Sequence, residues 1–62
     1  MKWIEIDSKL ARSGLRAFTG REFLSVTGAT PVAGKFLLIR YTKRGLLRRL
    51  KRGLYAVANR LP

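Results

Sequence analysis

The stretch Arg40–Val57, RYTKRGLLRRLKRGLYAV, decides how the second half of this chain folds. It holds seven of the fourteen Lys and Arg residues. Three structures fit it: a disordered basic tail, one amphipathic helix that continues to Arg52, or a helix end followed by a β-hairpin. Gly45 and Gly53 favour the hairpin, because glycine commonly ends helices and accepts the positive φ angles of tight turns.

The second half of the stretch predicts a basic wing. Residues 46–51 are expected to pair with residues 54–58 around a Lys-Arg-Gly turn, since Tyr55 and Val57 favour strands. Leucines interrupt the arginines, so we expect Leu50, Tyr55 and Val57 to anchor the hairpin to the core. The arginines between them then face outward.

A short helix precedes this region, in FTGREFLSVTG. Thr19 lies three residues before Glu22, which is the spacing of a capping box. Phe18 precedes the cap and Phe23 is the fourth helical residue, which is the pairing of a hydrophobic staple. We therefore predict a helix over residues 20–27 that ends at the following glycine.

The next helix is predicted over residues 31–44, with Thr30 as its cap and Pro31 in its first turn. Gly34 inside it costs about 1 kcal/mol relative to alanine. Its apolar residues occupy two faces, one with Leu37, Leu38 and Tyr41 and the other with Val32, Phe36 and Ile39. One core covers only one face, so the second is expected to pack on the hairpin, join a homodimer, or meet thymine methyl groups.

The first block of the chain, residues 1–14, gives a less clear prediction of secondary structure. Ile4 and Ile6 alternate with acidic residues as in a strand, but Trp3, Ile6 and Leu10 also share one helical face at spacings of three and four. We expect a helix over the second half of the block, capped by Asp7 or Ser8, reaching Ser13 and stopped by Gly14. The order helix, helix, helix, hairpin predicts a mainly α fold with a small β-hairpin (α+β). This is a three-helix winged helix-turn-helix, with residues 1–62 as one DNA-binding domain.

Composition narrows the function. The net charge is +11, with fourteen Lys and Arg against three acidic residues, and there is no Cys or His. Such a charge favours a polyanionic partner. Three carboxylates without a suitable pairing, and serines with no candidate base except Lys, argue against an enzyme, a metal site or a cofactor. Because no apolar run approaches the roughly 20 residues that span a bilayer, we expect a cytoplasmic protein without a membrane partner.

Double-stranded DNA is the predicted partner, with helix 31–44 in the major groove and wing 46–58 on the backbone. The predicted DNA-binding residues are Thr30, Lys35, Arg40, Lys43, Arg44, Arg48, Arg49, Lys51 and Arg52. Each of these cations is also compatible with a simple solvated surface charge. The predicted homodimer uses Phe36 and Ile39 or the N-terminal segment.

Two other functions remain open. A general nucleic-acid or ribosome-associated RNA binder would use the same charge, and RNA recognition often involves exposed aromatic residues. We assign five aromatic residues to the core instead, because so small a domain needs their buried area. They are Trp3, Phe18, Phe23, Tyr41 and Tyr55. A peptide lying on an anionic membrane surface is the third possibility.

From Leu15 to Pro62 the chain resembles the winged helix-turn-helix domain of AbiEi-type (type IV toxin–antitoxin) antitoxins and related bacterial regulators. The resemblance lies in FTGREFLSVTGATP, in a leucine-rich helix ending Lys-x-Gly, and in the wing Leu47–Tyr55, which ends Arg-Gly-Leu-Tyr. It implies a small transcriptional regulator that autorepresses a toxin–antitoxin operon. Those antitoxins carry a further C-terminal domain, which these residues do not include.

Two departures from the family's pattern concern helix 31–44. Gly34 stands where such domains often carry a larger residue. Phe36 and Ile39 stand where they often carry polar residues that face the groove. DNA binding is therefore the firmer implication of the resemblance, ahead of an antitoxin role.

Overall fold

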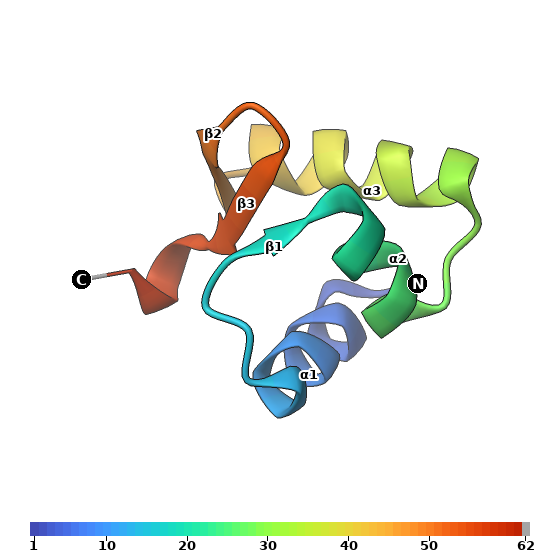
Figure 1. The fold of residues 1–62 in the computed structure, drawn as a ribbon, viewed down its shortest axis with the longest axis horizontal. Helices are drawn as coiled ribbons and strands as arrows, with labels where there is room; N and C mark the ends of the chain where they lie inside the picture. The colour runs from blue at the N-terminus through green and yellow to red at the C-terminus, as the bar shows by residue number, and fades with distance from the viewer. Residues whose placement is uncertain (62) are drawn as a thin grey trace.

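The computed structural model describes residues 1–61, which form three α-helices and a three-stranded antiparallel sheet of order β1-β3-β2 (Figure 1). The elements are α1 (Trp3–Ser13), β1 (Phe18–Thr19), α2 (Gly20–Thr27), α3 (Pro31–Lys43), β2 (Leu47–Lys51), β3 (Leu54–Val57) and the 3₁₀ helix η1 (Ala58–Arg60). In Figure 1, α3 lies at the top, α1 at the bottom, and α2 and β1 between them. The predicted α+β winged helix-turn-helix fold is confirmed.

The start of α2 has the predicted capping box. The Thr19 amide donates to Glu22 Oε1 at 2.9 Å, and the Glu22 amide donates to Thr19 Oγ1 at 3.2 Å. The predicted staple is present as well, since the rings of Phe18 and Phe23 stack with their centroids 5.7 Å apart. Both rings are fully buried. Gly28 ends the helix with a φ of 73°.

Strand β1 was not predicted from the sequence. Phe18 pairs with Tyr55 and Thr19 with Leu54, so β1 adds a third strand to the hairpin. Two residues are too few to show the alternation by which strands are recognised. The pairing fixes the start of α2 directly to the wing.

Helix α1 begins earlier than the sequence predicts, at Trp3. The residue before it, Lys2, makes no side-chain capping bond, and Asp7 and Ser8 lie inside the helix. The prediction that Asp7 or Ser8 caps α1 is therefore wrong. Asp7 instead forms an ion pair with Arg60 of η1, which joins the helix to the end of the chain.

Tertiary packing explains why α1 forms without a cap. Ile6 and Leu10 are fully buried on one face of it. Trp3, on the same face, packs its ring against Tyr41 of α3 at a centroid distance of 5.1 Å. The Tyr41 hydroxyl donates to the Met1 carbonyl at 3.3 Å. Burial of this apolar face outweighs the missing cap, as it does for most protein helices.

Helix α3 starts at its predicted cap, where Thr30 Oγ1 accepts a hydrogen bond from the Ala33 amide at 3.2 Å. It ends at Lys43, one residue before the predicted boundary, with Arg44 as its C-cap. Gly45 follows with a φ of 78°. A single helix through Arg52 is thereby excluded.

Gly34 is the point of closest approach between α2 and α3. It is buried, and a Cβ atom placed on it would overlap Leu24 Cδ2 of α2. Glycine at position 34 lowers the helix propensity of α3, but it allows the two helices to pack closely.

The hairpin forms as predicted, from β2 and β3, but one of its three expected anchors is wrong. Val57 is buried and Tyr55 is partly buried against the core. Leu50 is 44% exposed, whereas Leu47 is only 2% exposed. Leu47 and Leu50 are three residues apart, so an alternating strand places them on opposite faces, and the strand is also irregular between Arg49 and Lys51.

We predict that Leu47→Ala lowers the free energy of unfolding by about 2–5 kcal/mol, because it removes a buried side chain from a small core. Leu50→Ala makes a matched control and is expected to cost less than about 1 kcal/mol. Urea unfolding followed by circular dichroism measures both. Equal destabilisation of the two variants would contradict the assignment of Leu47 as the anchor.

A second prediction concerns the packing of α2 against α3. In a Leu24→Ala background, Gly34→Ala is expected to stabilise the protein by up to about 1 kcal/mol. The space beside residue 34 is then free, so the substitution changes only the helix propensity of α3. In the natural background the same change must also displace Leu24, so its effect is less favourable. A double-mutant cycle on the free energy of unfolding measures this coupling. A coupling of zero would mean that Gly34 and Leu24 do not compete for space.

Candidate nucleic-acid interface

The outward face of α3 carries both cations and large apolar side chains. Its exposed residues follow one another at spacings of three and four, which places them on one side of a helix. Besides Pro31 in the first turn and the small Ala33, they are Val32, Lys35, Phe36, Ile39, Arg40 and Lys43. The opposite side of α3, with Leu38 and Tyr41, belongs to the core.

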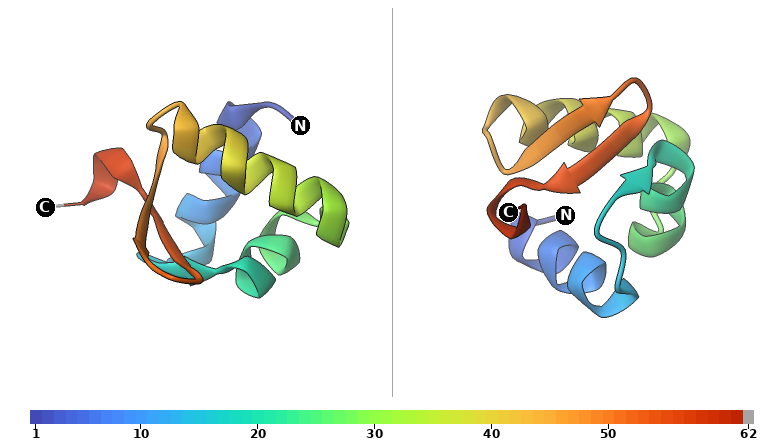
Figure 2. Two further views of the ribbon diagram at one scale, coloured as in Figure 1. Left: turned by 90° about the horizontal axis from the view of Figure 1, so that it is seen from above. Right: turned by 60° about the vertical axis from the view of Figure 1, so that its left-hand side comes forward.

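The wing adds a second group of cations. Arg48, Arg49 and Lys51 lie on β2 and Arg52 in the turn, and all four are exposed. Gly53, with a φ of 80°, completes the two-residue connection between the strands. The hairpin begins at the C-terminal end of α3, and its turn lies on the side of the molecule opposite α1 (Figure 1). Figure 2 shows the turn carried away from that helix end, toward β1 and the start of α2, in agreement with the pairing of Leu54 with Thr19.

Residues 31–53, which form α3 and most of the wing, contain no acidic residue. The three acidic residues of the chain are Glu5, Asp7 and Glu22, all in its first half. Within residues 1–61 the ion pair that forms joins Asp7 to Arg60, and Glu22 is engaged in the capping box. Residues 31–53 contain eight of the fourteen cations. The outward face of α3 and the wing are therefore strongly positive, with Glu22 as the acidic residue nearest the wing, since its partner Thr19 pairs with Leu54.

All nine residues predicted to bind DNA are exposed, and they lie on α3, at its two ends, or on the wing. Two of them also have structural partners. The hydroxyl of Thr30 caps α3, and the guanidinium of Arg44 lies 5.6 Å from the centroid of the Tyr41 ring. Their binding to DNA stays a prediction.

The aromatic residues lie where the sequence places them. Phe18, Phe23 and Tyr41 are buried in the core, and Trp3 and Tyr55 pack against it. Among residues 1–61, Phe36 is the aromatic residue with a large exposed ring, at 68%. Because bases stack on exposed rings, this surface offers little to single-stranded RNA.

The sequence patterns separated the apolar and basic residues of α3 and did not place them together. The structure shows one mixed face, in which Val32, Phe36 and Ile39 stand among the cations. Of the three expected covers for these residues, packing on the hairpin is wrong, since they are 69%, 68% and 49% exposed. Their spacing to Lys35, Arg40 and Lys43 is the signal that identifies the shared face.

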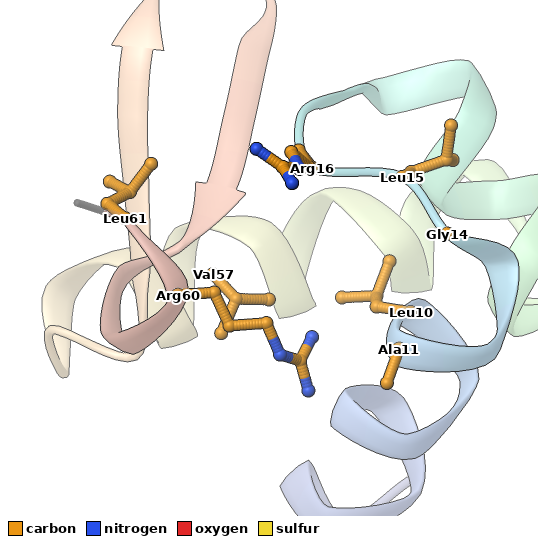
Figure 3. Close-up of a pocket in the computed structure, with 8 residues that line it drawn as sticks. All are labelled: Leu10, Ala11, Gly14, Leu15, Arg16, Val57, Arg60 and Leu61. Atoms are coloured by element: carbon orange, nitrogen blue, oxygen red, sulfur yellow. The ribbon is translucent and has the colours of Figure 1, made fainter.

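A separate cavity of about 490 Å³ lies between the end of α1, the segment before β1 and the region around η1 (Figure 3). Its lining is mostly apolar and includes the side chains of Arg16 and Arg60. It contains no carboxylate, thiol or imidazole, so it lacks the groups of an acid–base or nucleophilic site. The lining residues are Leu10, Ala11, Gly14, Leu15, Arg16, Val57, Arg60 and Leu61.

The part of the chain that the structure describes contains neither a metal-ligand cluster nor a membrane-spanning helix. Among residues 1–61, no group of three or more His, Cys, Asp or Glu side chains is arranged to hold a metal ion. None of the helices in the same residues is long and apolar enough to cross a membrane.

Comparison with known families matches residues 8–58 to the family described as "Transcriptional regulator, AbiEi antitoxin". No curated protein and no solved structure matches the chain. The match includes α2 together with α3 and the hairpin, which carry the basic surface. It describes a family of regulators and not a class of enzymes. The chain belongs to the AbiEi antitoxin family of transcriptional regulators.

Proposed function

We propose that this protein is a small repressor that binds double-stranded DNA of its own operon in a sequence-specific manner. The observation that supports this most directly is the basic surface of α3 and the wing. Its eight cations lie in residues 31–53, with no acidic residue among them. Because the family consists of transcriptional regulators, DNA is the expected ligand of such a surface.

In the proposed complex, α3 enters the major groove. A helix of 13 residues is about 20 Å long, and the major groove, about 12 Å wide, admits a helix. Lys35 and Arg40 flank the outward face, where they reach base edges or phosphates. Thr30 lies at the N-terminus of the helix, whose free amide groups favour a phosphate.

The wing is proposed to lie on the sugar-phosphate backbone. Lys51 and Arg52 are at its tip, and Arg48 and Arg49 continue the charge along β2. At the helix end, Lys43 and Arg44 are adjacent to the wing in sequence. Phosphate contacts of this kind supply affinity and orientation but no sequence information.

The salt dependence of binding tests the role of the wing. We predict that the double variant Lys51→Ala/Arg52→Ala binds operator DNA more weakly. The slope of log Kd against log salt concentration should fall by about 1 for each phosphate that the variant no longer neutralises. Fluorescence anisotropy at several salt concentrations measures both effects.

The control variant Lys9→Ala/Arg12→Ala removes the same charge from α1, on the opposite side of the molecule. Its slope is expected to stay close to that of the natural protein. Equal weakening in both variants would show that net charge, and not the wing, determines binding. Equal affinity for operator and random duplex would contradict specific regulation, and a preference for structured RNA would favour the general RNA-binding alternative.

A further inference from the structure

The outward face of α3 has an unusual composition for a helix that reads DNA. Val32, Phe36 and Ile39 form a continuous apolar stripe along it, at spacings of four and three residues. Because each residue advances by about 100°, Lys35 and Arg40 lie on the two sides of this stripe. Lys43 lies at its C-terminal end. The apolar stripe is thus framed by cations.

Exposure of this stripe is not needed by the fold. The core is filled from the other side of α3 by Leu38 and Tyr41, with Gly34 allowing α2 to approach. An exposed cluster of large apolar side chains on so small a protein indicates a binding surface. The question is which partner covers it.

Charge argues against a second copy of this chain as the partner. In a twofold dimer through the stripe, Lys35, Arg40 and Lys43 of one protomer would face the same three cations of the other. Like charges in an interface are costly, and no acidic side chain on this face relieves them. The frame of cations fits a polyanion that also offers apolar groups.

The major groove of DNA is such a ligand. Its phosphates are anionic, and the thymine 5-methyl group is the apolar feature that its base edges present. The exposed residues of α3 include no Asn, Gln or Ser, which are the usual readers of adenine and other bases. Apolar contact is therefore the reading mode that this face provides, besides its cations.

We infer that the apolar stripe reads thymine methyl groups in the major groove, with Phe36 at its centre as the main specificity-determining residue. This rests on the proposed function, in which α3 enters that groove. The expected target is a duplex with thymines opposite the stripe, flanked by phosphates or guanines that meet Lys35 and Arg40. Recognition then depends on the methyl groups and not on the hydrogen-bonding edges of those bases.

Replacement of thymine by deoxyuridine tests this inference, because it removes the methyl group and keeps every hydrogen-bonding group. A tight-binding duplex is first selected from a random-sequence pool, and its thymines are then replaced one at a time. At the contacted thymines, Kd from fluorescence anisotropy is expected to rise about fourfold for each methyl group removed.

The variant Phe36→Ala should bind the thymine duplex more weakly and show no sensitivity to the replacement nearest Phe36. Because Phe36 is exposed, the thermal unfolding of this variant should stay close to that of the natural protein. Ile4→Ala is the matched control, since Ile4 is an exposed apolar residue on α1. This control should keep the full preference for thymine over deoxyuridine.

The possible failures can be told apart. Specific duplex binding that is indifferent to every deoxyuridine replacement would overturn the inference and leave the proposed function intact. Equal binding of selected and random duplexes would overturn both. Sedimentation that shows a DNA-free dimer, converted to a monomer by Phe36→Ala, would assign the stripe to self-association and also overturn the inference.

Discussion

The packing of Phe18 against Phe23 and Tyr55 is the interaction on which the rest of the structure depends. Phe18 is fully buried, stacks on Phe23 of α2 at 5.7 Å, and stacks on Tyr55 of β3 at 6.4 Å. Its backbone pairs with that of Tyr55, and the next residue, Thr19, caps α2. One short segment thereby fixes the second helix and the wing to each other. In so small a protein, such a shared interaction replaces a larger core.

From this packing the position of α3 follows. Helix α2 holds α3 closely at Gly34, where no side chain fits beside Leu24. Leu38 and Tyr41 then face the core, so the residues of the outward face are not needed to pack it. Departures from local preference often mark function, and here there are two: a glycine inside a helix and large apolar residues in solvent. The glycine serves packing, and the exposed residues serve the proposed reading of DNA.

Local signals in the sequence predicted much of this fold. The capping box at Thr19, the Thr30 cap and the glycine-divided hairpin each involve residues close in sequence, so their geometry is readable without the tertiary structure. Strand β1 and the start of α1 depend on distant partners, and were missed or misplaced. Leu50 was wrongly predicted to be an anchor of the hairpin, although the alternation of side chains along a strand places it on the face opposite Leu47. For the site, the exposed cations were predictable, but their sharing of a face with Phe36 required the packing of α3.

The central claim is that the outward face of α3 and the wing form one DNA-binding surface. Amide chemical-shift changes in the ¹⁵N-labelled protein, titrated with the selected duplex, test it most directly, and a chain of 62 residues suits the method. The account predicts that the largest changes fall on residues 30–44 and 47–54, while the exposed face of α1 stays unchanged. Changes concentrated on α1 and the cavity beside η1, with α3 unaffected, would contradict it.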